Sequence, residues 1–159
     1  MIMMTQGVAC GGYPALVMTA QDVFKAMLRE HIAPEMRRAG LKGSGQKYRL
    51  DLADHFALLG IQRASGSDAE VIRWTANVLA VSRADWSALV AKYPHHGDAP
   101  KHNYSYGNWD TRVSLLAYAT DRWWEVRSDQ DPAAASTEPL AAIREYGLPW
   151  LLARTQVGP

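Results

Sequence analysis

The sequence predicts an α+β domain in which a mostly antiparallel sheet of about five strands carries helices packed on one face. Three observations predict this class. Segments of alternating polarity occupy the middle of the chain, capping signals mark helices before and after them, and short turns connect the alternating segments. The expected order is α-β-β-β-α-β-β-α, a meander followed by a hairpin.

The first predicted element is a helix that begins at Thr19. Thr19 and Asp22 have the spacing of a capping box, in which a hydroxyl and a carboxylate satisfy unpaired backbone amides. The apolar residues that follow at helical spacing are Val23, Phe24, Met27, Leu28 and Ile32. Pro34 lacks an N–H and crowds the carbonyl four residues earlier, so we expect it to kink or interrupt this helix before its end at Gly40.

Three strands are predicted next, over residues 47–53, 55–64 and 70–81. The first alternates between apolar and charged residues, and the second is apolar on both faces, as in a central strand. The third places five apolar side chains on one face: Ile72, Trp74, Ala76, Val78 and Ala80. Its other face then carries Arg73, Thr75 and Asn77.

The second half of the chain alternates between helices and a predicted hairpin. Ser82 and Asp85 have capping-box spacing, and Pro94 ends the helix that they begin. A loop over residues 94–108 precedes a hairpin, with strands over residues 112–118 and 122–127. The remaining elements are a solvated connector over residues 128–137 and a helical pair that starts near Glu138, breaks at Gly147 and restarts at Pro149.

The sequence resembles the bacterial domain-of-unknown-function family numbered 4304, through several residues that form no reactive motif. They are Pro34 and Gly40 in the opening helix, Gln62 and Asn77 in the strands, Trp109, Arg112, the segment from Asp121 to Val126, and the closing segment from Tyr146 to Leu151. The resemblance covers roughly residues 19–155 and brings no established activity with it. Members look like free-standing small cytosolic proteins, which favours a binding role by analogy.

Length and composition predict one domain over residues 19–155, between a disordered leader (1–18) and a short tail (156–159). The formal net charge of +1 argues against a dedicated nucleic-acid or membrane-surface protein. Cys10 is the single cysteine, which excludes an internal disulfide and a thiolate metal site. No apolar stretch approaches ~20 residues and the N-terminus lacks a basic start, so we expect a cytoplasmic protein without a membrane span.

The glycine-rich segment 40–47 has the Gly-x4-Gly spacing of a phosphate-binding loop, but Gln46 and Tyr48 stand where Lys and Ser or Thr are required. We therefore interpret it as a helix terminator and flexible turn. The basic residues between Arg37 and Arg49 are interpreted as cations favoured at a helix C-terminus. An acidic protein partner and RNA remain alternatives for that basic patch.

The loop after the second helix contains the histidine cluster His95, His96 and His102. No cysteine and only Asp98 lie near enough in sequence to complete a tetrahedral set, so solvated loop histidines are favoured over a metal site. No metal, cofactor or catalytic residue is predicted. Acid–base chemistry from Asp51, Asp54 or Glu125 with His55 as a base is compatible with the sequence, although nothing in their spacing requires it.

Two regions are candidates for binding. Residues 104–109 gather aromatic side chains that either cap the core or face a partner. Trp123 and Trp124 must point to opposite faces of a strand, so one of them is expected beside the polar face of the sheet. The candidate residues of these regions together are Gln62, Arg73, Thr75, Asn77, Tyr104, Tyr106, Trp109, Arg112, Trp124 and Glu125.

These features predict a non-enzymatic protein-interaction domain, one that neutralises or escorts a partner through the aromatic loop and the polar sheet face. The alternative is a small-molecule-binding protein or enzyme on that polar face, with Arg73 binding an anion and His55 or Glu125 transferring a proton. Nucleic-acid binding through the basic patch ranks third.

Overall fold

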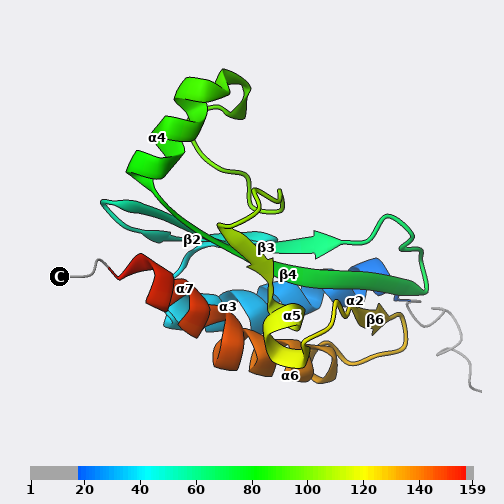
Figure 1. Cartoon of the computed structure of the whole chain (residues 1–159). Coiled ribbons are helices and arrows are strands. Elements are labelled where there is room, and N and C mark those ends of the chain that lie inside the picture. Colours follow the sequence, from blue (N-terminus) through cyan, green and yellow to red (C-terminus); the bar gives the residue numbers. More distant parts are fainter. Residues whose placement is uncertain (1–17, 157–159) are drawn as a thin grey trace, which may run out of the picture.

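The computed structural model describes residues 18–156 and shows a six-stranded sheet with two long helical segments packed against one face (Figure 1). This arrangement confirms the predicted α+β class with an antiparallel sheet. The predicted leader and tail lie outside the described residues, apart from Met18 and Gln156.

The first helical segment consists of α2 (Ala20–Met27), the π-helical turn η1 (Leu28–Ile32) and α3 (Ala33–Arg38). Its capping box is confirmed, because Asp22 N donates to Thr19 Oγ1 at 3.1 Å and Thr19 N donates to the Asp22 carboxylate at 2.9 Å. The predicted interruption takes the form of the π turn η1 just before Pro34, and the chain stays helical, since helical dihedrals continue through Leu28 and Ala33. The wider π turn just before the proline relieves the crowding that its ring causes in an α-helix.

The last helical segment repeats this device with α6 (Pro132–Ala142), the π-helical turn η3 (Ile143–Gly147) and α7 (Leu148–Thr155). The predicted break at Gly147 is therefore wrong, because the π turn again comes just before a proline, Pro149. The predicted start near Glu138 is also wrong. Asp131 caps the helix by accepting from Ala134 N at 3.1 Å, and Pro132 suits the first helical position.

The sheet is a meander with a divided edge. The strands β1 (Lys42–Ser44), β2 (Lys47–Asp51), β3 (His55–Arg63) and β4 (Val71–Ser82) pair in order, all antiparallel. Strands β5 (Asp110–Arg112) and β6 (Trp124–Arg127) both pair with β4, at Asn77–Leu79 and at Val71–Trp74 respectively. Strand β1 was not predicted. Positive φ angles at Gly43 (132°) and Gly45 (60°) let segment 40–47 form a hairpin with β2.

The predicted hairpin of residues 112–118 and 122–127 is wrong in its first strand. Val113–Tyr118 form the helix α5, which ends at Ala119 in the left-handed conformation (φ 57°). A short apolar run fits helical and strand periodicity equally well, and here tertiary packing selects the helix. As a result β6 pairs with β4 and not with β5.

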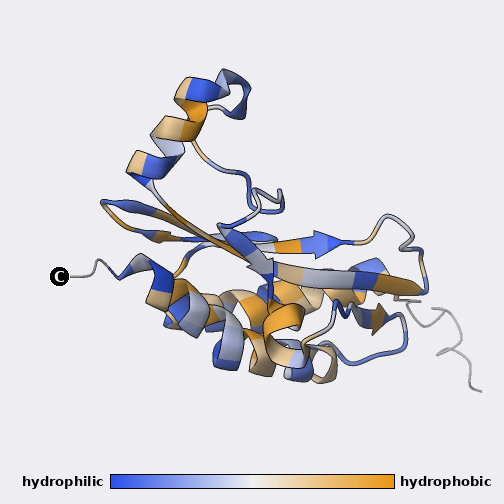
Figure 2. Cartoon of the chain, viewed as in Figure 1, coloured by the Kyte–Doolittle hydropathy of each residue, from blue (hydrophilic) through white to orange (hydrophobic). Residues whose placement is uncertain are grey.

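The main core lies between the sheet and the helices α2, α3, α6 and α7, on what we call the helix face. The predicted inner side chains of β4 are buried there, and Trp74 packs against Trp124 and Phe24 at ring-centroid distances of 4.9 and 6.1 Å. In Figure 2 the helix α5 on this side is mainly hydrophobic in colour. None of the helices within residues 18–156 has the length and apolar character that crossing a lipid bilayer requires.

The opposite side of the sheet, which we call the loop face, carries the helix α4 (Arg83–Lys92) and the short helix η2 (Pro94–His96). Figure 1 shows α4 projecting from the sheet away from the other helices. Ser82 caps α4 as predicted, by accepting from Asp85 N at 3.0 Å. Trp86 is the buried residue of α4, and it forms a second, smaller core with Leu58, Leu79 and Val81.

Candidate functional site

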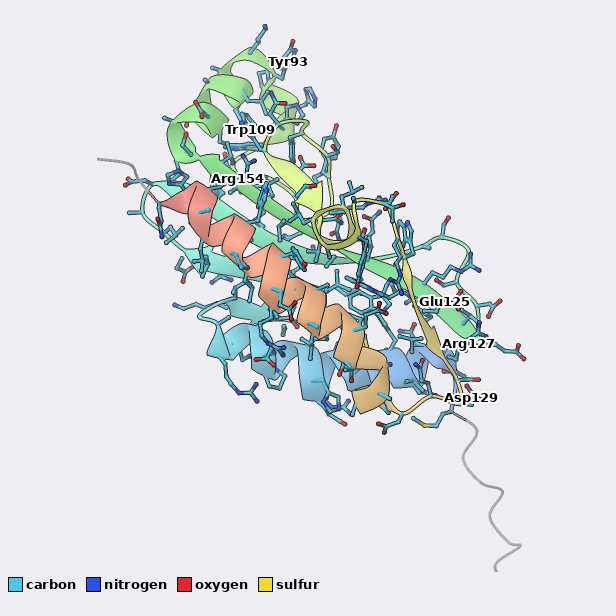
Figure 3. All side chains as sticks on the ribbon, turned by 60° about the horizontal axis from the view of Figure 1, so that its bottom comes forward. Tyr93, Trp109, Glu125, Arg127, Asp129 and Arg154 are labelled. Atoms are coloured by element: carbon cyan, nitrogen blue, oxygen red, sulfur yellow. The ribbon has the colours of Figure 1, made fainter. Side chains whose placement is uncertain are left out.

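The loop face has three zones along β4, and Arg73, Asn77 and Leu79, whose side chains all lie on this face, each belong to one of them. The first zone is an ion-pair network at the end that pairs with β6. Arg73 Nε donates to Glu125 at 3.1 Å, and an Arg127 guanidinium nitrogen donates to the same carboxylate at 2.8 Å. Figure 3 shows Glu125 and Arg127 beside each other, far from Trp109 and Tyr93. Both arginine side chains are exposed and the Glu125 side chain is partly exposed, so the network contributes little to stability.

The second zone is an aromatic cluster at the other end of β4. Trp86 lies at its centre, with ring centroids 5.2 Å from Tyr106 and 6.4 Å from Trp109, and its indole N–H donates to the Gly97 carbonyl at 3.2 Å. The Tyr106 hydroxyl accepts from Lys101 N at 3.0 Å. Tyr106 and Trp109 therefore cap the smaller core.

The third zone, between the other two, is a hollow of ≈ 330 Å³ that is open to solvent on one side. Residues from three strands, from helix α5 and from two connecting segments surround it. Those used below are Gln62, Asn77, Asn103, Tyr104, Arg112 and Leu115. Its volume lies at the lower end of the range for small-ligand sites, which is roughly 300–1,000 Å³.

A chain of carboxamides forms the floor of this hollow. Asn103 Nδ2 donates to the Ile61 carbonyl at 3.1 Å, and Asn77 Nδ2 donates to Asn103 Oδ1 at 3.0 Å. Asn77 Nδ2 also donates to Gln62 Oε1 at 2.8 Å. These bonds fix the orientation of three neutral polar side chains in a small area of the sheet.

The loop approaches the sheet this closely because β3 has a glycine at the point of contact. A Cβ at Gly60 would lie 2.8 Å from the His102 carbonyl oxygen and would also collide with Asn103 Oδ1. His102 anchors the same segment, with its Nε2 3.1 Å from the Tyr48 carbonyl oxygen. Burial lowers the pKa of His102 and Lys47 and Arg49 lower it further, whereas the bond to Tyr48 raises it. The net lowering favours a neutral imidazole that donates to Tyr48.

Arg112 supplies the charged side of the hollow, but its charge is already compensated. Its guanidinium donates to Asp121 at 2.6 Å and lies 4.8 Å from the centroid of the Trp123 ring. These two contacts hold the guanidinium in place. A ligand in the hollow therefore meets a neutral ion pair and neutral amides, an environment suited to a polar, uncharged group.

The structure separates the candidate residues that the sequence singled out. The hollow brings together Gln62, Asn77, Tyr104 and Arg112. Four others lie outside it: Tyr106 and Trp109 in the aromatic cluster, and Arg73 and Glu125 in the ion-pair network.

Thr75 and Trp124 are buried, at 0 % and 4 % exposure. The Thr75 hydroxyl has no hydrogen-bond partner in residues 18–156. Trp124 belongs to the helix-face core, so the structure gives it no place on the loop face.

Sequence reasoning missed Asn103, Leu115 and Asp121 because their places depend on how loops cross the sheet. Gly60 offered one usable signal. A glycine within an otherwise apolar central strand often marks the close approach of another backbone.

The charged residues of the basic patch and Asp51 form contacts with nearby residues of the same chain. Arg37 donates to the Gly43 carbonyl at 3.2 Å, and Asp51 pairs with Lys42 and Arg49 at 2.8 and 2.9 Å. Hydrogen bonds from Lys42 and Arg49 lower the pKa of Asp51. In the part of the chain that the structure describes, no three His, Cys, Asp or Glu side chains converge closely enough to hold a metal ion.

Comparison with known proteins identifies a family. No curated protein and no solved structure matches the chain. One family model does match, over residues 32–153, and it is described as a domain of unknown function, DUF4304. These residues include α3, the sheet, the hollow, α6 and most of α7, whereas α2 lies before the matched range. The chain therefore belongs to the DUF4304 family.

Proposed function

We propose that the protein is a non-enzymatic interaction domain that binds a partner protein through the hollow of the loop face and its rim. The observation that supports this most strongly is the rim itself. Tyr104 is 49 % exposed and Leu115 is 44 % exposed, and both border the hollow. Exposed tyrosine beside a partly enclosed depression is typical of binding hot spots in protein interfaces.

The support below this rim also favours binding. Hydrogen bonds from Asn103 and His102 to backbone carbonyls hold the loop on the sheet, so Tyr104 projects from an ordered base. An ordered loop loses little conformational entropy when a partner binds. Tyr104 also packs against Tyr106 at 4.6 Å between ring centroids, which links the rim to the smaller core.

The test compares capture of a partner by variants of the full chain carrying a photo-crosslinker at Ser105, a residue that lines the hollow. Tyr104→Ala and Leu115→Ala should each reduce the yield of one specific crosslinked protein at least ~10-fold, the scale of a hot-spot truncation. Leu152→Ala is the matched control, because Leu152 is also 49 % exposed but lies on α7. Equal capture by all three variants would refute the proposal.

A small-molecule function is the second candidate, and the carboxamide floor favours it. A hollow of ≈ 330 Å³ with several fixed polar groups suits a ligand of modest size. Under this alternative, a low-molecular-weight cell extract should raise the melting temperature of the chain, and Gln62→Ala should abolish that increase. An unchanged melting temperature with every extract fraction would count against it.

A further inference from the structure

In the carboxamide floor, the donor and acceptor ends of each amide can be assigned in turn, starting from a backbone carbonyl. The Ile61 carbonyl can only accept, so the Asn103 group that faces it at 3.1 Å must be the NH₂. Asn103 therefore presents its oxygen to Asn77, and Asn77 must answer with its own NH₂ at 3.0 Å. The second hydrogen of that NH₂ meets an oxygen of Gln62 at 2.8 Å.

This assignment leaves one donor and one acceptor at the end of the chain. The donor is Gln62 Nε2 and the acceptor is Asn77 Oδ1, and neither has a partner among residues 18–156. Neither is among the polar atoms buried without a partner in that range, so both reach solvent. Both side chains line the hollow. The two amides are joined by a hydrogen bond of 2.8 Å, so the unused donor and the unused acceptor belong to side chains in direct contact.

We propose that the hollow recognises a group that carries a C=O and an N–H on the same edge, namely a primary carboxamide or a cis-lactam. The ligand C=O accepts from Gln62 Nε2, and the ligand N–H donates to Asn77 Oδ1. Asp121 compensates the charge of Arg112, so a carboxylate gains little from that side chain and faces the Asn77 oxygen with a second acceptor. The proposal rests on the hollow that the proposed function uses.

This chemistry has two sources, and they are distinguished by two sets of probes. The first is a small molecule with a lactam edge, for which 2-pyrrolidinone is the probe. The second is a glutamine side chain of a partner protein, for which N-acetylglutamine methylamide is the probe. N-acetylglutamate methylamide has the same backbone amides and differs only in the side-chain group, so it is the matched control.

The experiment is an NMR titration of the ¹⁵N-labelled full chain, with the side-chain NH₂ signals of Gln62, Asn77 and Asn103 as the readout. We expect saturable shifts of the Gln62 signal with both amide probes, and binding of the glutamate control at least ~10-fold weaker at neutral pH. A lactam that binds more tightly than the glutamine probe indicates the small molecule as the source, and the reverse order indicates a partner side chain. Absence of any Gln62 shift up to the solubility limit of both probes overturns the proposal.

The substitution Gln62→Glu tests whether Gln62 recognises the ligand directly, because a residue with only a structural role would not change which ligand is preferred. The substituted carboxylate still accepts from Asn77 but offers a second acceptor in place of the NH₂ donor, so the site would then match a group with two donors. We expect this variant to bind acetamidine at least ~10-fold more tightly than acetamide, whereas the native chain prefers acetamide. The control is Asn108→Asp, which makes the same change of charge at an exposed position in the loop before β5. This variant should keep the native preference for acetamide. An unchanged preference in Gln62→Glu overturns the proposal.

Failure here and failure of the proposed function give different results. If the amide probes do not bind but Tyr104→Ala still removes the crosslinked partner, only the carboxamide specificity is refuted. If the probes bind and no partner is captured, protein interaction is refuted and a small-ligand function remains.

Discussion

The two faces of the sheet are covered by different means. Apolar packing covers the helix face and leaves three buried polar atoms without a hydrogen-bond partner among residues 18–156: Tyr48 Oη, Trp74 Nε1 and Trp124 Nε1. The loop face has a smaller apolar core, and directed hydrogen bonds from Asn103 and His102 hold its loop in place. We expect packing on the first face to supply most of the stability, and the polar bonds on the second to position the groups to which we assign ligand recognition.

Tyr48 and His102 illustrate this contrast at one position of β2. Burial of the Tyr48 side chain on the helix face raises its pKa to about 12, so the phenol is kept neutral among apolar neighbours. The backbone carbonyl of the same residue faces His102 on the loop side. One residue therefore serves the packed face with its side chain and the hydrogen-bonded face with its main chain.

The largest expected effect tests which face supplies the stability. Leu58 and Leu59 are adjacent in β3 and point to the loop face and the helix face respectively. We expect Leu59→Ala to lower the free energy of unfolding by about 4 kcal/mol and Leu58→Ala by about 2 kcal/mol, because the smaller cluster has partly exposed neighbours that can close the cavity. Urea denaturation measures both. Equal losses, or a larger loss for Leu58→Ala, would contradict the comparison.

The next effect concerns the glycine that lets the loop approach the sheet. Gly60→Ala should cost about 2 kcal/mol, because the new methyl group collides with the segment at 102–103 and forces it away. The Asn77 side-chain NH₂ signals should shift at the same time, as the carboxamide floor opens. Gly66→Ala is the control, because among the described residues, its chain neighbours aside, no atom lies within 4 Å of its Cβ position, and it should stay within about 0.5 kcal/mol of the native chain. A native Asn77 signal in Gly60→Ala would contradict this account.

The smallest effect is a pH dependence confined to the loop face. Burial lowers the pKa of His102 below its ordinary 6.5, so the detached loop binds a proton more readily than the docked loop. Loop docking is therefore fully favoured above pH 6.5 and weakens as the pH falls through 6.5 toward the lowered value. The protection of the amides of residues 100–108 against hydrogen exchange, corrected for the pH dependence of the intrinsic rate, should decrease over this interval, while that of the helix-face core is unaffected.

His102→Gln keeps a donor that can face the Tyr48 carbonyl but does not titrate, and should abolish this pH dependence. His95→Gln replaces an exposed histidine and should leave it intact. If residues 100–108 of His102→Gln still lost protection against hydrogen exchange at acid pH, the pH dependence would belong to another group.

Local patterns predicted the packed face well. The Thr19 cap, the alternation in β4 and the central position of β3 are confirmed, because each depends on neighbours along the chain and on the division between apolar and polar residues. Predictions from local patterns failed where the same stretch of sequence is compatible with two different backbone structures. The run Val113–Tyr118 fits a strand or a helix, and a proline after a helical run implies a break unless a π turn precedes it.

The site was predictable only in part. Strand alternation indicated the polar face with Gln62, Asn77 and Arg112, and Tyr104 was a candidate in the separate aromatic loop; the structure brings all four to one hollow, and their role in binding stays a prediction. Asn103 and Asp121 come from loops whose paths depend on contacts distant in sequence. Trp124 was assigned to the binding face, but the strand register places it opposite Trp74 and inside the core.

The divided edge of the sheet restricts how another chain can attach. Long stretches of unpaired edge backbone invite strand addition and aggregation. Within residues 18–156 the outermost strands are short: β1 and β5 have three residues each and β6 has four, with α5 inserted between the last two. A partner that docks on this protein must therefore be recognised through side chains and shape, because the fold offers little template for main-chain pairing.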